Sequence, residues 1–209
     1  MIPMLILTEG RFGAAVADII TSQEDATVRR LTEVIRDRPA EFLSGEAFVA
    51  VALWRPYNEE CDALDEAFWR AGVPWSCAYL TEDKLVCGPL TIPHHGPCYG
   101  CFRRRYLTHY RAPERELHLS RAYARDPDLG PAGFVPAMAW IAASGLMSDA
   151  RAPRVAAGRL RRVDLFTGGM IETRVVGTHH CSRCGRENEE RPGDRFVRQL
   201  VPAVQELLQ

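Results

Sequence analysis

The sequence lacks several features that would assign it to a broad class of protein. It has no apolar run long enough to span a membrane, and its N-terminus lacks the basic region and small-residue cleavage site of a signal peptide. The formal net charge is only -1 over 209 residues, with both signs interspersed, which argues against a nucleic-acid-binding protein. Repeats and low-complexity tracts are also missing. These absences predict a cytoplasmic protein that binds neither membranes nor nucleic acid.

Four of the seven cysteines form two C-x-x-C pairs far apart in the chain, Cys98 with Cys101 and Cys181 with Cys184. Two thiolates at this spacing can reach one metal ion from a single turn, and four make a closed tetrahedral Zn²⁺ site. A closed site has no position for water, so the predicted role of zinc is structural. The alternatives are disulfides, which need an oxidising compartment, or a redox motif, which would not need a second pair. As free thiols, the other three cysteines fit a reducing cytoplasm: Cys61, Cys77 and Cys87.

The N-terminal stretch has the order strand, glycine turn and helix that opens a nucleotide-binding unit. Residues 4–8 are an apolar run, and residues 14–20 are rich in small helix-forming side chains. Gly10 and Gly13 align with the last two glycines of G-x-G-x-x-G, but Thr8 replaces the first, and the Glu9 carboxylate lies beside the turn. We interpret the motif as degenerate, a remnant of the fold rather than a working phosphate cradle.

The following segments alternate between helical and strand patterns, which predicts an α/β fold with a mostly parallel sheet. Residues 48–54 read as a central strand buried on both faces, and a helix from Asn58 or Asp62 to about Ala71 should end at Gly72. An amphipathic helix is expected over 26–38, a strand over 73–80, a helix over 102–109, a mobile crossover over 112–131, an apolar helix over 134–147, a hairpin over 156–176 and a terminal helix over 196–208. We expect residues 1–111 to form the core and residues 112–209 to complete the same domain.

The stretch from 48 to 105 resembles the ubiquitin-activating-enzyme-like superfamily of ThiF/MoeB type. The resemblance is carried by a helix leading into Gly72-Val73-Pro74, a strand, and then Gly88-Pro89-Leu90 and Pro97-Cys98-Tyr99-Gly100-Cys101. It implies a Rossmann-like sheet and a structural zinc site completed by a late second C-x-x-C pair.

Within this superfamily the chain is most similar to the divergent branch found in the biosynthesis of azol(in)e-modified peptides. That likeness implies a non-catalytic partner of a YcaO-type cyclodehydratase that helps to present a precursor peptide, forms a homodimer and does not bind ATP. Activating members place an Asp after the strand that ends here in Arg55-Pro56-Tyr57-Asn58, and transthiolating members carry a cysteine in the region where residues 102–180 have none. Because the chain begins at its first strand, we expect leader-peptide recognition to need another protein or surface, since no winged-helix module precedes it.

Two other functions are alternatives to a non-catalytic partner of a cyclodehydratase. An ATP-dependent adenylyltransferase, activating a peptide or carrier-protein carboxylate, would use Gly10, Gly13 and Arg55 at the nucleotide. Phosphate contacts would also come from Arg11 and from the only lysine, Lys84. A zinc-dependent hydrolase would use the histidines near the cysteine pairs: His94, His95, His179 and His180. The preferred interpretation is that these histidines are solvated or form hydrogen bonds to the cysteine sulfurs.

The run Arg103 to Arg105 in the predicted helix has two readings. It is either a solvated helix face, which is the preferred interpretation, or a surface for an acidic partner.

Overall fold

A seven-stranded sheet forms the centre of the structure, a computed structural model that describes residues 3–36, 47–152 and 154–185. The strand order is β2-β1-β3-β4-β5-β6-β7. Strands β2, β1, β3 and β4 are parallel, whereas each later strand pairs antiparallel with its neighbour. The bounds are β1 Met4–Glu9, β2 Ala26–Arg30, β3 Phe48–Leu53, β4 Trp75–Leu80, β5 Lys84–Cys87, β6 Arg159–Asp164 and β7 Met170–Arg174. The predicted α/β class is therefore confirmed.

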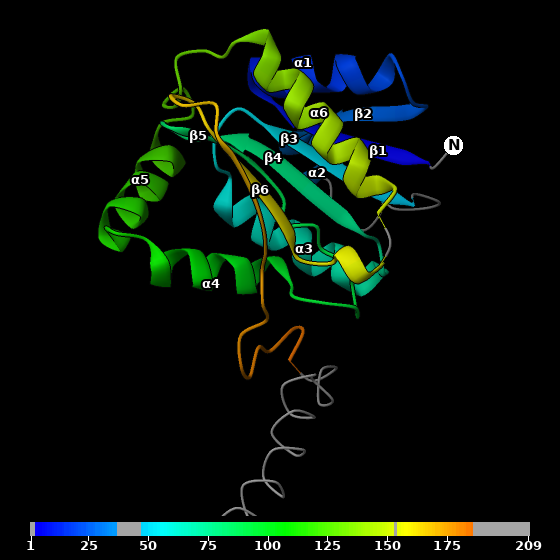
Figure 1. The fold of residues 1–209 in the computed structure, drawn as a ribbon, viewed down its shortest axis with the longest axis vertical. Coiled ribbons are helices and arrows are strands. Elements are labelled where there is room, and N and C mark those ends of the chain that lie inside the picture. The colour runs from blue at the N-terminus through cyan, green and yellow to red at the C-terminus, as the bar shows by residue number, and fades with distance from the viewer. Residues whose placement is uncertain (1–2, 37–46, 153, 186–209) are drawn as a thin grey trace, which may run out of the picture.

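Helices cover both faces of this sheet (Figure 1). Helices α1 (Gly10–Thr21) and α6 (Pro136–Ala150) pack on one face. The other face carries α2 (Leu31–Arg36), α3 (Asn58–Ala71) and α4 (Tyr99–His109), and α5 (Pro113–Arg125) lies beside α4. A short 3₁₀ helix, Arg154–Ala156, precedes β6.

The two faces follow from the alternation of side chains along the strands. In β1, Ile6 packs in the cluster under α1 and α6, whereas Leu7 packs in the cluster under α3. Every residue of β1, β3 and β4 is buried, as expected of strands covered on both faces. Helix α3 ends where predicted, because Gly72 adopts the left-handed conformation at φ 70°.

Two sequence-based predictions were wrong. Residues 26–38 were expected to be one helix, but Ala26–Arg30 is strand β2, which pairs parallel with β1 before α2 begins at Leu31. The apolar spacing of the segment also fits an edge strand followed by a short helix, and pairing with β1 decides between them. Residues 112–131 were expected to be a mobile crossover but contain α5. That helix has proline at its first position, acidic residues in its first turn and Arg125 in its last, which all favour a helix.

The predicted hairpin is confirmed as β6 and β7, and it leads into the second cysteine pair. The predicted helix over 196–208 lies outside the described residues. No helix among the described residues has both the length and the apolar character needed to cross a membrane.

Candidate metal centre and nucleotide crevice

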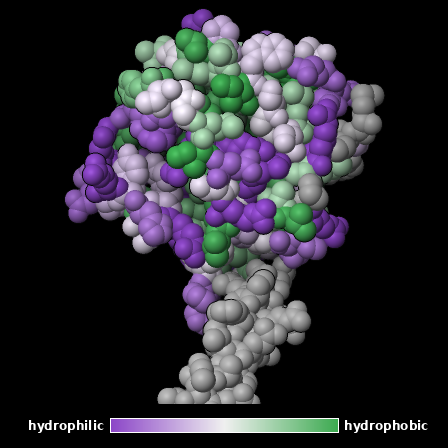
Figure 2. All heavy atoms as spheres, viewed as in Figure 1, coloured by the Kyte–Doolittle hydropathy of each residue, from purple (hydrophilic) through white to green (hydrophobic). Residues whose placement is uncertain are grey.

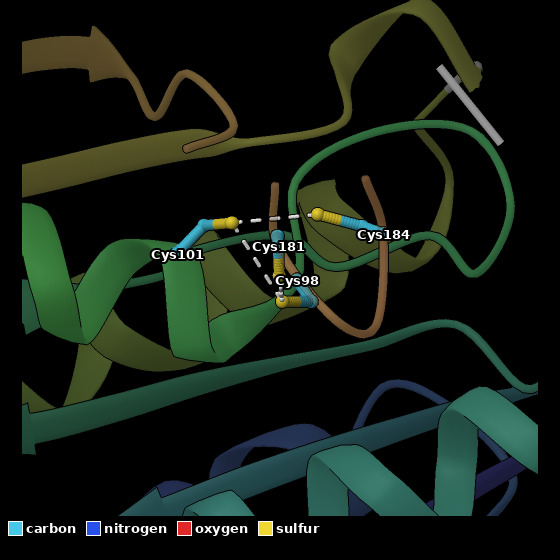
Figure 3. Close-up of side chains that lie close together, drawn as sticks. All are labelled: Cys98, Cys101, Cys181 and Cys184. Carbon is cyan, nitrogen blue, oxygen red and sulfur yellow. Dashed lines mark hydrogen bonds between the residues drawn. The ribbon is translucent and has the colours of Figure 1, made fainter. Parts of the chain in front are cut away.

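The structure brings the four cysteines of the two C-x-x-C pairs together (Figure 3). All four ligand sulfurs lie within 4.8 Å of one another, and all four residues are buried. The Sγ–Sγ distances are 3.8 Å from Cys98 to Cys101, 3.6 Å from Cys98 to Cys181 and 3.3 Å from Cys101 to Cys184. Sulfurs at about 2.3 Å from a central zinc ion would form a tetrahedron with edges of about 3.8 Å. The spacing and the soft donor set therefore fit a tetrahedral metal ion.

Local structure explains how the sulfurs converge. Cys98 is the N-cap of α4 and Cys101 lies in its first turn, so both side chains leave the same helix end. The backbone N–H of Thr178 donates to Cys101 Sγ over 3.3 Å. The pKa of the Cys101 thiol is lowered, first by its hydrogen bond with Cys184 and then by that with Cys98. The same hydrogen bonds raise the pKa of Cys98 and of Cys184, so the negative charge among these sulfurs concentrates on Cys101.

The histidines near the cysteine pairs do not join this cluster. Within the described ranges, the only group of three or more close metal-binding side chains is the four cysteines. His94 is exposed, and its ring lies 5.3 Å from that of Trp69. A four-sulfur set leaves no coordination position for a catalytic water, so the geometry does not favour a zinc-dependent hydrolase.

A buried carboxylate, which the sequence analysis missed, ties the two cysteine pairs to the core. Asp65 of α3 is fully buried and accepts hydrogen bonds from Trp75 Nε1 (3.1 Å) and from the backbone N–H of Tyr99 (3.1 Å), next to Cys98. It also pairs with Arg183, between the last two cysteines. The one available signal was an acidic residue within the apolar stripe of the predicted helix, next to Leu64.

An indole ring lies in the crevice above the first turn of α1. Trp54, which follows β3, lies against Gly10: a Cβ at Gly10 would stand only 2.5 Å from Trp54 Cγ. From the other side Gly130 approaches the same ring, where a Cβ would stand 2.5 Å from Cη2. Gly13 packs so tightly on β3 that a Cβ would collide with the carbonyl oxygen of Ala52. Both glycines of the degenerate motif are therefore needed for packing, whether or not a phosphate binds.

Glu9 and Arg55, which flank the crevice, both have partners within the protein. The Glu9 carboxylate pairs with Arg30 Nη2 at 2.8 Å. Arg55 is 4% exposed, and its guanidinium carbon lies 4.6 Å from the ring centroids of both Tyr57 and Tyr123. Its Nη2 donates to the carbonyl oxygen of Tyr123 over 3.2 Å. The guanidinium therefore fixes α5 to the end of β3.

The other two basic residues proposed for phosphate contacts lie at different sites. Arg11 lines a cavity of about 540 Å³ at the carboxyl ends of the parallel strands, together with Phe12, Trp54 and Phe134. Lys84 begins β5, pairs with Asp83 and lines a separate cavity. The structure does not bring Arg11, Arg55 and Lys84 around one ligand position.

Comparison with known proteins adds information on the fold. No protein-family model matches this sequence, and no curated protein sequence matches it. The structure of the heterocyclase TruD is similar with a TM-score of 0.59 and 18% identity, over 91% of this chain and 28% of that one. E. coli MccB with ATP gives a TM-score of 0.57 and 17% identity, over 88% of this chain and 67% of that one.

A further match is the microcin C7 biosynthetic enzyme MccB in complex with N-formylated MccA, with a TM-score of 0.59 and 15% identity. That match covers 88% of this chain and 67% of the enzyme. At such identities the likeness shows a shared fold. The chain spans little more than a quarter of TruD and about two thirds of MccB.

Proposed function

We propose that this chain is a non-catalytic, ThiF-like partner of a YcaO-type cyclodehydratase that acts on a precursor peptide in azoline formation. The proposal is supported by the structural likeness to a heterocyclase and to an enzyme solved in complex with a peptide. Through the resemblance noted in the sequence, it also draws on the two C-x-x-C pairs and on the Gly-Pro-Leu segment before them.

The observation that carries the non-catalytic part is the position of Trp54. Open α/β sheets bind nucleotides at the carboxyl ends of the strands, at the point where two neighbouring strands connect to helices on opposite faces of the sheet. Here β1 connects to α1 on one face and β3 connects to α3 on the other. The Trp54 ring lies between Gly10 and Gly130 at the carboxyl ends of these two strands. A phosphate approaching the first turn of α1 would have to displace this ring.

Zinc is the metal that we propose for the four-cysteine site, because four thiolates in a closed tetrahedral set are typical of structural zinc. The ion would hold the segment after β7 against the first turn of α4. Chelation should therefore unfold at least that segment, since the energy of metal binding is folding energy in such sites. Metal analysis of purified protein should find about one zinc per chain; a metal-free protein with an unchanged melting transition would overturn the assignment.

The alternative function is an ATP-dependent adenylyltransferase, and one observation favours it. The cavity of about 540 Å³ opens beside Gly10 and Arg11, at the edge where the fold places ligands. Arg11 would then supply the phosphate contacts without Arg55 and Lys84.

Calorimetry separates the two functions. Zinc-replete protein should give no heat with ATP and Mg²⁺, no change in tryptophan fluorescence and no ATP–pyrophosphate exchange. Binding in the micromolar range, about -8 kcal/mol, would show that a nucleotide enters despite Trp54 and would favour the adenylyltransferase. Arg11→Ala should then abolish the heat, whereas Lys84→Ala should not.

A homodimer is part of the proposal, and α6 offers the surface for it. The buried side of α6 packs on the sheet through small residues such as Ala142 and Ala143, while Trp140 is 52% and Ile141 40% exposed. Figure 2 shows hydrophobic side chains among hydrophilic ones on the face that carries α6. Light scattering should report a dimer that Trp140→Glu converts to a monomer, whereas a charge at the exposed Val155 should have no effect.

A further inference from the structure

Two cavities meet along α4, outside both the metal centre and the nucleotide crevice. One, of about 390 Å³, lies between α4 and the β6–β7 hairpin, and the other, of about 260 Å³, lies between α4, α5 and the β4–β5 turn. Both are lined by Tyr106, Tyr110 and Arg162. We refer to the two cavities together as the α4 groove.

Aromatic rings at every fourth residue line the α4 side of this groove. The ring centroids of Phe102 and Tyr106 are 5.9 Å apart, and those of Tyr106 and Tyr110 are 5.1 Å apart with their planes inclined by 29°. Tyrosine rings offer apolar contact area together with a hydroxyl group, a combination common in surfaces that bind peptides.

The charges on the hairpin differ sharply between its two faces. On the α6 face, Arg159 and Arg161 both pair with buried Asp149, at 2.7 Å and 2.9 Å, and Arg161 also pairs with Glu172. On the α4 face, no carboxylate of the described residues lies within 4.0 Å of the Arg162 guanidinium. Arg162 is only half-buried, so its charge is available to a ligand.

The remaining lining charges keep the groove positive. Among the described residues, no acidic side chain lines the cavity beside the hairpin, and His109, Arg105 and Arg174 line it together with Arg162. Arg105 donates from Nε and Nη2 to the carbonyl oxygens of Val176 and Gly177, which fixes its guanidinium beside the hairpin. In the second cavity each acidic residue already has a cationic partner, and Arg111 adds a further cation: Glu82 pairs with Arg115, Asp83 with Lys84 and Glu116 with Arg103.

We infer that the α4 groove binds an extended acidic segment of a partner polypeptide, with a carboxylate on Arg162 and apolar side chains on the tyrosine rings. Charge complementarity selects acidic residues. An extended segment fits because the two cavities share Tyr106, Tyr110 and Arg162 and so continue one another along α4. Nucleic acid fits less well, because the formal net charge of the chain is only -1 with both signs interspersed. The inference does not depend on whether the chain binds a nucleotide.

The test is fluorescence anisotropy with a short labelled peptide in which glutamate alternates with serine and leucine. The full chain should bind it, and should not bind the same peptide with lysine in place of glutamate. Arg162→Glu should weaken binding at least about tenfold, and Arg162→Gln by less. Arg104→Glu is the matched control: it reverses one charge on the exposed side of α4, lines neither cavity and should change the affinity less than about twofold.

A second measurement does not depend on the folding of the variants. Peptide added to the wild-type chain should shift the amide resonances of α4 and of the β6–β7 hairpin while leaving those of α1 unchanged. Equal binding of the acidic and basic peptides would overturn the inference. So would an unchanged affinity in Arg162→Glu, resonance shifts elsewhere, or a single-stranded oligonucleotide that binds the groove when the peptide does not.

Discussion

Replacing Gly10 with alanine should destabilise the chain far more than the same change at Gly72. Both glycines lie in the left-handed region, at φ 72° and 70°, so both substitutions carry the conformational cost of about 1–2 kcal/mol for an L-residue there. The new Cβ at Gly72 has no atom within 4 Å, whereas at Gly10 it would overlap the Trp54 ring. Overpacking of this kind costs about 1–3 kcal/mol more.

Denaturant unfolding of both variants measures this difference directly. An extra loss of about 1–3 kcal/mol at Gly10 corresponds to a melting temperature lower by roughly 2–12 °C in a chain of this size. In a Trp54→Ala background the excess cost of Gly10→Ala over Gly72→Ala should shrink, because the indole ring is gone and only the Cβ of residue 54, at 2.9 Å, still meets the new Cβ. If Gly10→Ala costs no more than Gly72→Ala, or if the excess is undiminished without the indole, the packing of Trp54 on Gly10 that supports the non-catalytic proposal is wrong.

Three further predictions concern buried ionisable groups. Asp65→Asn should lower the free energy of unfolding by about 2–4 kcal/mol, because an amide N–H₂ would face one of its donors and Arg183 would lose its counter-charge. Glu66→Gln, on the exposed side of the same helix, should cost less than about 1 kcal/mol, and equal midpoints in urea would contradict the role of Asp65. Burial raises the pKa of Cys87 to about 12 and also raises the pKa values of Cys61 and Cys77. Iodoacetamide should therefore label none of these three thiols in the native protein at neutral pH and all of them after unfolding. Mass spectrometry of the labelled protein checks this. Burial also raises the pKa of the Glu116 carboxyl group above its usual 4.5, despite the nearby Arg103. The contribution of this group to stability is therefore present below pH 4.5 and is lost as the pH rises through the pKa of the folded state. Glu116→Gln should gain stability relative to wild type as the pH rises over that range, and a stability difference that does not change with pH would show that the pKa of Glu116 is not raised.

Local patterns predicted most of the central sheet. The continuous apolar run of β3 and the glycine at the end of α3 both depend on neighbouring residues alone, and both elements formed where expected. Residues 26–30 were assigned to a helix because their apolar residues have helical spacing. Their strand conformation comes from pairing with β1, whose residues lie more than twenty positions away in the sequence. The error at α5 has a different cause. The residues that favour its helix ends were present in the sequence, but the proline and charged residues of the segment were given more weight and indicated a loop.

The four cysteines were found from their spacing, because a C-x-x-C pair defines its own chemistry before the chain folds. The environment around them could not be found in this way. Asp65 looks like one more polar residue on a helix until α3, α4 and the turn at Arg183 are packed around it.

The sequence by itself determined the α/β alternation, the two cysteine pairs and the loss of the first motif glycine, since each is a property of a few adjacent residues. Only the tertiary structure decided that the four sulfurs converge, that Trp54 packs on Gly10 in the crevice, and that Arg55 is buried against aromatic rings. These contacts join segments that are distant along the chain, and their energies depend on burial and geometry that arise only when the sheet and its helices pack together.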